Sequence, residues 1–390
     1  MEVQNTFKGT MLLPEYMSKK KFVLGQYFTK KSIVDKTINL ILKYKKYDKA
    51  IKILEPSFGT GNFIKGLKDK GFNNMVGCEI DEQFTEDSSD FFNFPLTEKF
   101  DLVIGNPPFT KYNLKDSYYY LNNHNNNLMR PEEYLTSKLM GKEKVQIENA
   151  FILKSIKHLK DKDSSIGFVL PISFFIKNKN NEIKREIANH FSTIIIYQNS
   201  EKWVDEPIPC CFTIFTNVER LANKILLLYE DGGYVEEVLD KSQLLTEELI
   251  PKSFLYKKNN HQEGTPLSEF LTDEKVRYSR SYSENNVSGA NILERNRIPD
   301  NKDVVDYRLA IVRVGNASVG KAGLINVKKD VLNDMFYVFG FKEQFNENKE
   351  LKERICKLIN ENQKHFKNLT FRVGSKSIKK IDVFDFKANL

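Results

Sequence analysis

Short apolar runs and amphipathic segments alternate along the first part of the chain. The apolar runs have the length of buried strands and lie at 50–54, 74–79, 100–104, 167–171, 193–197 and 211–217. The amphipathic segments follow helical periodicity at 32–47, 62–70, 146–160 and 179–191, and Ser32 is placed to cap the first of them. Strands separated by helices are typical of a parallel sheet that is covered on both faces. The pattern therefore predicts an α/β fold with a mostly parallel sheet.

The pattern changes near residue 235, where the chain becomes more polar and irregular. Apolar runs at 309–314 and 335–340 and the segment 380–386 predict strands, and 347–366 predicts a helix. We therefore expect two domains, 1–235 and 236–390, the second of mixed α+β type. The asparagine-rich stretch at 122–127 predicts a loop that runs to about 144.

Composition and charge narrow the class of protein. Hydrophobic residues make up 40% and charged residues 29% of the 390 residues, which is typical of a globular chain. The longest apolar run, 166–176, is interrupted by Pro171 and is shorter than the roughly 20 residues of a membrane helix. The net charge of +8 is shared between the two predicted domains. A basic face for a polyanion would therefore have to be created by the fold.

The 4 cysteines form no CxxC pair, and the histidines do not have zinc spacing. We expect no structural metal, and no secretory signal is recognisable at the N-terminus. These features predict a cytoplasmic protein. Cys210 and Cys211 follow a proline but begin an apolar run, so we interpret them as structural. His124 and His158 have no catalytic partner nearby in the sequence, and we expect them to be solvated or on a helix surface.

Residues 53–63 (ILEPSFGTGNF) place a strand, an acid and a glycine-rich turn before a helix. This first strand-to-helix turn of an α/β sheet lies where ligands bind, and its glycines allow close approach of the backbone. A dinucleotide-binding turn would need a third glycine, but that position holds Ile64. Glu55 would also repel a pyrophosphate. The motif instead suits a ligand with an ammonium group and no phosphate, such as S-adenosylmethionine.

Glu79 ends the next predicted strand. A carboxylate at this position can accept hydrogen bonds from both hydroxyl groups of a ribose. Ile80 would then lie against the adenine ring of the same ligand. Together with the glycine-rich turn, this acid predicts a pocket for an adenosyl cofactor.

The third predicted strand ends in the string IGNPPF, residues 104–109. Pro107 and Pro108 stiffen the backbone and remove two N–H donors. The side-chain oxygen of Asn106 and the carbonyl of Pro107 remain as acceptors beside the ring of Phe109. Two acceptors and an aromatic ring suit the exocyclic amino group of a planar base, which stacks on such a ring with about 1–3 kcal/mol.

These residues resemble the [DNS]-P-P-[YFW] motif of the S-adenosylmethionine-dependent amino-methyltransferases. Further family motifs are similar in order: LGQYFT at 24–29, the glycine loop, GCEID, DFF at 90–92, and IGFVLPISFF at 166–175. The order is that of the gamma class of DNA adenine-N6 methyltransferases, whose prototypes are type II modification enzymes. The resemblance covers about residues 22–217. Phe109 departs from it, since many relatives have tyrosine there.

The resemblance implies a Rossmann-like methyltransferase domain followed by a DNA target-recognition domain. It implies S-adenosyl-L-methionine as cofactor, with contacts from Thr29, Glu55, Pro56, Ser57, Gly59, Gly61, Glu79, Ile80, Asp90, Phe91 and Asn106. Asp90 would meet the amino group of the cofactor adenine and Phe91 its ring. The catalytic set would be Asn106, Pro107, Pro108, Phe109 and Trp203, where Trp203 would be a second aromatic against the flipped base or, alternatively, a half-buried structural residue.

The same resemblance implies double-stranded DNA as partner, a monomer on DNA, and a companion restriction endonuclease. In the second domain the basic, glycine-rich segment 313–323 predicts DNA contacts through Arg313, Asn316 and Lys321, and Arg372 is a similar candidate. An exposed hairpin without ligand is the alternative for this segment.

Three further functions remain open from the sequence. The acceptor amino group could belong to cytosine N4, to RNA adenine or to a protein glutamine. The chain could be a DNA-recognition module without catalysis, although Asn106, Glu55 and Glu79 argue against that. A nucleotide-dependent oxidoreductase is disfavoured by the absent third glycine.

Overall fold

The computed structural model describes residues 24–113, 144–206, 208–259, 263–274, 278, 286–370 and 377–389. The chain divides into two compact units at Pro251/Lys252, and each is described here by itself. The loop predicted at 122–127 and Arg372 lie outside the described residues. Within those residues, no helix combines the length and the apolar character that a membrane crossing requires.

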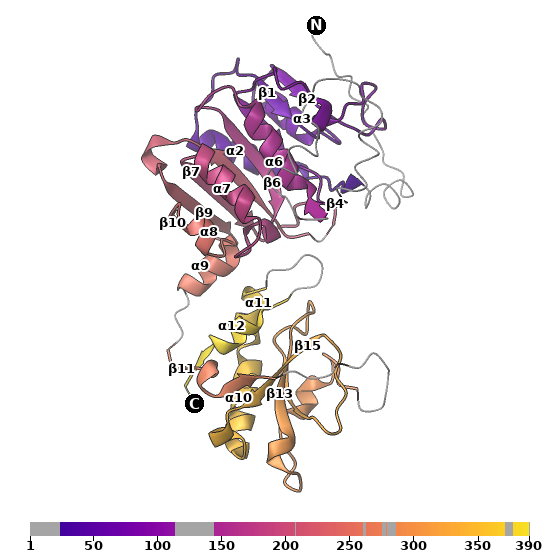
Figure 1. Ribbon diagram of the computed structural model, residues 1–390, viewed down its shortest axis with the longest axis vertical. Helices are drawn as coiled ribbons and strands as arrows, with labels where there is room; N and C mark the ends of the chain where they lie inside the picture. The colour runs from indigo at the N-terminus through magenta and orange to yellow at the C-terminus, as the bar shows by residue number, and fades with distance from the viewer. Residues whose placement is uncertain are drawn as a thin grey trace. The chain divides into compact units, whose positions relative to one another are not determined.

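The first unit is built on an eight-stranded sheet with the order β10-β9-β7-β8-β6-β3-β1-β2 (Figure 1). Its strands are β1 (Ile53–Glu55), β2 (Met75–Gly77), β3 (Leu102–Gly105), β6 (Ser165–Pro171), β7 (Thr193–Asn199), β8 (Cys210–Thr216), β9 (Lys224–Glu230) and β10 (Tyr234–Asp240). Strands β2, β1, β3 and β6 are parallel, and β8 runs antiparallel to its neighbours β6 and β7. A separate two-stranded antiparallel sheet pairs β4 (Lys111–Asn113) with β5 (Lys144–Gln146).

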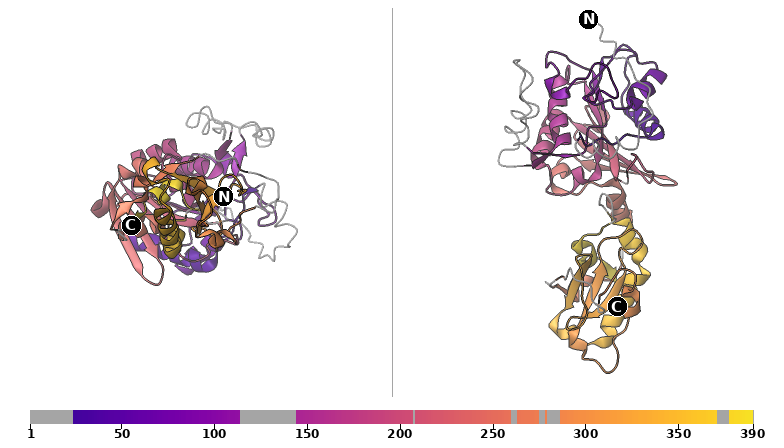
Figure 2. Two further views of the ribbon diagram at one scale, coloured as in Figure 1. Left: turned by 90° about the horizontal axis from the view of Figure 1, so that it is seen from below. Right: turned by 90° about the vertical axis from the view of Figure 1, so that its right-hand side faces the viewer.

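Helices cover both faces of this sheet. The helix α6 (Ile147–His158) and the helix α7 (Asn181–His190) lie on one face, and α2 (Lys31–Tyr44) lies on the other (Figures 1 and 2). The helix α3 (Asn62–Asp69) packs on α2, and the buried side chains of β1, β3, β6, β8 and α2 form one continuous core. The predicted α/β architecture and its mostly parallel sheet are confirmed.

The boundary predicted at 235/236 is wrong, because it falls inside β10. Residues Tyr234–Asp240 pair along their whole length with β9, whose central residues are buried. The side chains of β10 are mostly exposed, so its sequence lacks an apolar run. Backbone hydrogen bonds to β9 hold β10 in the sheet. Such bonds do not produce an apolar pattern in the sequence, so the pattern could not predict the strand. Ser32 is also not the cap of α2, which begins after Lys30 without a side-chain cap.

The first unit ends with α8 (Gln243–Thr246), and α9 (Pro251–Asn259) follows at the division. The second unit has a four-stranded antiparallel sheet of order β12-β15-β13-β14, made of β12 (Leu271–Asp273), β13 (Tyr307–Val312), β14 (Ala322–Asn326) and β15 (Phe336–Phe341). The helix α10 (Lys349–Glu361) contributes Ile355 and Ile359 to its core. A two-stranded ladder joins β11 (Thr265–Pro266) to β16 (Lys387–Ala388).

The strand predicted at 380–386 is wrong, because the segment forms the short helix α12 (Lys380–Phe384). The carboxylate of Asp382 accepts from the backbone N–H of Lys379 at 2.9 Å and from Lys257 Nζ at 2.7 Å. This cap stabilises the first turn of a helix whose alternating apolar residues equally suit a strand. The helix predicted at 347–366 is divided at Asn362 into α10 and α11 (Gln363–Asn368).

Candidate cofactor and target site

A cavity of about 640 Å³ lies in the first unit. It is lined by residues that directly follow β1, β2 and β3, which end at Glu55, Gly77 and Gly105. The segment 24–29 and the first two turns of α6 complete its walls. Carboxyl ends of parallel strands are where open α/β sheets bind ligands, and the volume is that of a ligand pocket.

The glycine-rich turn after β1 has the conformation that its residues predict. Gly59 and Gly61 have φ values of +50° and +71°, which side chains rarely adopt. A side chain on Gly59 would also approach the ring of Phe28 to 2.9 Å. Gly59 lines the cavity, whereas Gly61 precedes α3 and does not line it.

Three buried acidic residues line the cavity, and two of them, Glu55 and Glu79, follow from the predicted cofactor motifs; the third is Asp81. Glu55 Oε2 accepts from the N–H of Ile64 at 3.1 Å. The two oxygens of Glu79 accept from the N–H groups of Gly59 at 2.7 Å and Asp81 at 2.9 Å. Together with a bond from the N–H of Ile80, these bonds fix the Glu79 carboxylate. A carboxylate has about four acceptor sites, so it keeps capacity for a ligand hydroxyl.

Burial dominates the electrostatics of both carboxyl groups. Loss of solvent raises the pKa of Glu55 well above its usual range, although the N–H of Ile64 opposes the shift. Burial also raises the pKa of Glu79, against the lowering effect of its backbone N–H donors. A buried carboxyl group with a raised pKa gains from a nearby positive charge. The Glu55 end of the cavity therefore favours a cationic ligand group.

The turn after residue 89 forms another wall of the cavity. Asp90 Oδ1 accepts from the N–H of Phe92 at 2.9 Å and so caps the short helix η1 (Phe91–Asn93). Phe91 and Phe92 pack against Phe151 of α6 with ring centroids 5.0 and 5.2 Å apart. Asp90, Phe91 and the 37% exposed Ile80 all line the cavity.

Asn106 follows β3 at the cavity wall, and its side-chain amide is oriented by one hydrogen bond. Nδ2 donates to the carbonyl oxygen of Tyr27 at 2.5 Å. Oδ1 is buried and accepts no hydrogen bond from any residue that the structure describes. An unsatisfied buried acceptor costs about 1–3 kcal/mol. Asn106 therefore presents an acceptor that a ligand N–H would satisfy.

The segment 24–29 also holds the proline turn through its backbone. Phe109 N donates to the carbonyl oxygen of Gly25 at 2.9 Å. Gly25 has a φ of +64°, and a side chain there would approach Thr110 Cβ to 2.8 Å. The rings of Tyr27 and Phe109 stack at 5.9 Å with an interplanar angle of 26°. These backbone and ring contacts therefore hold the segment 24–29 and the proline turn, residues 106–109, against each other.

The structure brings most predicted site residues to one cavity. Those that line it are Thr29, Glu55, Pro56, Ser57, Gly59, Glu79, Ile80, Asp90, Phe91, Asn106 and Pro108. Gly61, Pro107, Phe109 and Trp203 are not among the lining residues. A place in the cavity wall does not show what a residue binds or catalyses, so the binding and catalytic roles of these residues stay predictions.

The position of Trp203 contradicts its predicted place against a flipped base. Its side chain is only 2% exposed and packs on Tyr197 with ring centroids 5.8 Å apart. Nε1 donates to Asn199 Oδ1 at 2.5 Å, which satisfies the indole within the core. The carbonyl of Trp203 accepts from Lys30 N at 2.9 Å, so this residue anchors the chain just after the segment 24–29.

The sequence also predicted the surroundings of two cysteines and one histidine of the first unit. Cys210 and Cys211 are buried in β8, and burial raises the pKa of Cys211 to about 12, which agrees with their structural interpretation. His158 was expected on a helix surface, but it is fully buried on α6. Burial lowers the pKa of His158 to about 4, and its Nδ1 lies 2.9 Å from the carbonyl oxygen of Glu98.

The described candidates for DNA contacts in the second unit differ in their exposure and in their contacts. Arg313 Nε donates to the carbonyl oxygen of Asp334 at 2.5 Å, and its guanidinium lies 5.6 Å from the ring centroid of Tyr337. Asn316 is exposed on a turn, and Lys321 is half-buried. Their roles stay predictions.

Several lining residues were missed by sequence reasoning. The segment 24–29 contributes more than Thr29, since Gln26 Nε2 donates to Asp81 Oδ2 at 3.1 Å and both residues line the cavity. Ile147 and Phe151 of α6 also line it. Their spacing of four residues only predicted an apolar helix face, because the pattern does not distinguish a core contact from a pocket wall.

The strand order, the antiparallel β8 and a ligand cavity at the carboxyl ends of the parallel strands define the class: a Rossmann-like methyltransferase fold. The family described as N-6 DNA Methylase matches residues 63–292, and the chain belongs to this family.

Similar proteins include type II methyltransferases. M.HincII of Haemophilus influenzae is 30% identical over 191 residues, which are 47% of this chain and 35% of the relative. M.CvrRI of Paramecium bursaria Chlorella virus XZ-6E is 36% identical over 96 residues, 22% of this chain and 24% of the relative. The chain thus matches only about a third or less of the length of these relatives.

Two solved structures are also similar. The type IIL restriction-modification enzyme MmeI in complex with DNA has a TM-score of 0.45 and 10% identity, and the match covers 90% of this chain and 64% of that one. The methyltransferase subunit of a type I restriction-modification system from Streptococcus thermophilus has a TM-score of 0.40 and 14% identity, with 64% of this chain and 57% of that one covered.

Proposed function

We propose that this protein transfers a methyl group from S-adenosyl-L-methionine to the exocyclic N6 of an adenine in double-stranded DNA. The observation that carries the proposal is the buried Oδ1 of Asn106, which belongs to a residue of the cavity wall and has no hydrogen-bond partner in the described part of the chain. Its family and its type II methyltransferase relatives support DNA as the substrate. We expect the chain to be the modification enzyme of a restriction-modification system in the cytoplasm, with a cognate endonuclease as possible partner and a monomer as the form on DNA.

The donor set of the cavity fits S-adenosylmethionine. Glu79 offers two fixed carboxylate oxygens for the ribose hydroxyls. Glu55 offers a buried carboxyl group that gains from the positive charge of the methionine end. Asp90, Phe91 and Ile80 would hold the adenine, and Thr29, Pro56, Ser57 and Gly59 would complete the pocket. When bound, this cofactor supplies an electrophilic methyl group on a sulfonium sulfur.

Asn106 would bind the target amino group. Its Nδ2 is held by Tyr27, so Oδ1 keeps one direction and accepts an N–H of the base. A second acceptor, the carbonyl of Pro107, would take the other hydrogen. Such acceptors draw the nitrogen lone pair out of the ring and stabilise the positive charge that develops during transfer. Because the target lies within a duplex, the base must be flipped out of the stack.

The interlocked aromatic pair supports this placement. Tyr27 and Phe109 stack on each other and pack on the core that contains Trp203. We propose that Phe109 contacts the flipped base, with Tyr27 behind it. Because Trp203 is buried and its carbonyl accepts from Lys30 N, we propose that it positions the segment 24–29 instead of contacting the base.

We further propose that the second unit recognises the DNA target. Arg313, Asn316, Lys321 and Arg372 are its candidate contacts, and the positive net charge of the chain favours a polyanion. Base-edge contacts in this unit would select the site, since the catalytic cavity only selects a base.

The experiment is methylation of a duplex DNA library by the purified full-length chain, followed by single-molecule sequencing. The expected product is N6-methyladenine in one sequence context, formed only with S-adenosylmethionine. Methylation of cytosine, or of RNA or protein in place of DNA, would replace the proposed substrate by one of the other amino groups. Cofactor binding without any methyl transfer would favour a recognition module.

A further inference from the structure

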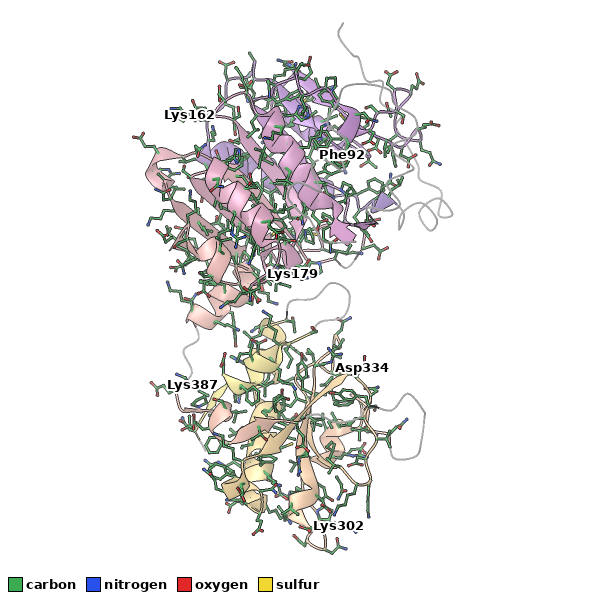
Figure 3. All side chains as sticks on the ribbon, in the orientation of Figure 1. Phe92, Lys162, Lys179, Lys302, Asp334 and Lys387 are labelled. Atoms are coloured by element: carbon green, nitrogen blue, oxygen red, sulfur yellow. The ribbon has the colours of Figure 1, made fainter. Side chains whose placement is uncertain are left out.

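Lys154 is a buried cation on the face of α6 that lies beneath the turn 90–94. Its side chain is 1% exposed, although lysine is rarely buried. Nζ donates to the carbonyl oxygens of Phe92 at 2.6 Å and Phe94 at 2.9 Å. It also lies 5.4 Å from the ring centroid of Phe91. Phe92, labelled in Figure 3, lies beside α6 in that view. One ammonium group thus binds the backbone of the turn at its middle and at its C-terminal end.

The same helix face supports the whole turn. Ile147, Phe151, Lys154 and His158 are three or four residues apart and therefore share one side of α6. Ile147 and Phe151 line the cavity, Lys154 binds the backbone of the turn, and His158 packs on Phe91 at 5.6 Å between ring centroids. The wall at Asp90 and Phe91 thus rests on this helix.

The ammonium group of Lys154 interacts electrostatically with the carboxylate of Asp90. Burial lowers the pKa of Lys154 to about 8, and the carboxylate of Asp90 is the main group that opposes this shift. Burial of a lysine without partners is costly, and an apolar side chain of the same length would avoid that cost. The two carbonyl bonds and Asp90 offset it. The ammonium group of Lys154 therefore binds the backbone of the turn and also attracts the carboxylate of Asp90, a residue that lines the cavity.

We propose that Lys154 is the positioning residue for the adenine end of the cofactor pocket. It holds the turn 90–94 so that the Asp90 carboxylate meets the exocyclic amino group of the adenosyl ring. This inference rests on the proposed function, because it assumes an adenosyl ligand in the cavity. It predicts that Lys154 determines selectivity for an amino-bearing purine without touching the ligand.

The test is calorimetric binding of S-adenosylhomocysteine and S-inosylhomocysteine to the full-length protein and its variants. The inosyl compound has an oxygen in place of the amino group. Lys154→Met should raise the dissociation constant of the adenosyl compound about 10- to 100-fold, the range for loss of hydrogen bonds to a charged group. The constant of the inosyl compound should change much less. Lys154→Arg, which keeps the charge, should restore most of the selectivity.

Two buried lysines serve as matched controls. Lys184 is also 1% exposed and donates to the carbonyl oxygen of Ile176 at 3.1 Å on α7. Lys352 is fully buried in the second unit and donates to Val304 O at 2.8 Å. Burial lowers the pKa of each to about 8, as it does for Lys154. Methionine at either position should leave the selectivity unchanged.

The outcomes separate this inference from the proposed function. Failure of the wild-type protein to bind S-adenosylhomocysteine would overturn the proposed function. Wild-type binding with equal weakening of both ligands in Lys154→Met would overturn the inference alone, as would unchanged constants. If Lys154→Met does not fold in thermal denaturation, Lys154→Gln takes its place, because its amide still donates to a carbonyl. Unchanged selectivity in Lys154→Gln would then overturn the requirement for charge.

Discussion

The side-chain amide of Asn106 donates to the carbonyl oxygen of Tyr27, a residue far away in the sequence, and its buried Oδ1 has no donor among the described residues. An asparagine amide can rotate to exchange its two ends, and this bond prevents that. The segment 24–29 therefore determines which end of the Asn106 amide is left as an acceptor.

Replacement of Asn106 by alanine should abolish the acceptor and leave the cofactor pocket intact. We expect methyl transfer to fall by about 100- to 1,000-fold, the range for loss of one preorganised group that stabilises the transition state. The dissociation constant of S-adenosylhomocysteine should change little. Radiolabelled methyl incorporation and calorimetry measure the two quantities. Asn74→Ala is the control, because the exposed Asn74 lies just before β2 and its side chain donates to Ala50 O at 3.2 Å. Near-normal transfer by Asn106→Ala would contradict the assigned role.

Gly25→Ala should displace the proline turn. The new methyl group would lie 2.8 Å from Thr110 Cβ and 2.9 Å from the backbone carbon of Phe109. A displacement of about 1 Å at a reacting group can cost about 100-fold in rate. Gly232→Ala provides the control, since Gly232 has the same φ of +64° and no atom within 4 Å. Both variants carry the backbone strain, and only Gly25→Ala carries the clash. Equal activity of the two variants would show that contact between the segment and the turn is unimportant.

Glu79→Gln should weaken cofactor binding. Both carboxylate oxygens accept backbone N–H groups, and the amide nitrogen of glutamine would face one of those donors. We expect the dissociation constant of S-adenosylhomocysteine to rise about 10- to 100-fold. The exposed Glu219→Gln is the control. An unchanged constant would refute the ribose assignment.

The affinity for the cofactor should also depend on pH through Glu79. Because burial raises the pKa of Glu79, protonation occurs at a higher pH than for an exposed carboxyl group. The charged form accepts the ligand hydroxyls, so affinity is present above that pKa and is lost as the pH falls through it. Calorimetric titrations across the acidic range measure this. The loss should disappear in Glu79→Gln, and persistence there would assign it to another group.

Trp203→Phe should reduce stability more than catalysis. The substitution removes the donor to Asn199 Oδ1 and part of a buried ring. We expect a loss of about 1–3 kcal/mol in the free energy of unfolding. Methyl transfer at a temperature below the transition should stay within a few-fold of wild type. A selective loss of transfer without a loss of stability would restore the base-contact role that its burial contradicts.

Truncation tests where the first unit ends. A chain ending at Pro251 retains β10 and α8, and it retains Leu249 N, which donates to Phe175 O at 3.1 Å. A chain ending at residue 235 cuts β10 and removes the buried Leu239 and Leu244. The longer fragment should bind S-adenosylhomocysteine and melt cooperatively, and the shorter should not. Equal folding of both fragments would contradict the division at Pro251.

Much of the cofactor site was predictable because its residues are neighbours in the chain. The turn from Glu55 to Gly61 needs positive φ values that only glycine adopts readily, and Asn106 to Phe109 are stiffened by two prolines. Their geometry depends on local backbone conformation, so residue type and spacing are sufficient to predict it. Six strands of the sheet followed from apolar runs for the same reason, whereas β9 and β10 were not predicted.

Tertiary structure decided what depends on distant parts of the chain. Several contacts join segments that are far apart in the sequence. They are the hydrogen bonds of Gly25 and Tyr27 with the proline turn, the packing that buries Trp203, and the contact of Lys154 with the turn 90–94. Periodicity assigns a residue to a buried face but does not name its partner there. The strand β10 and the helix α12 were mispredicted because a sheet neighbour and a side-chain cap outweighed the local pattern. Local sequence therefore determines the reactive turns, and packing decides which atoms face the cavity.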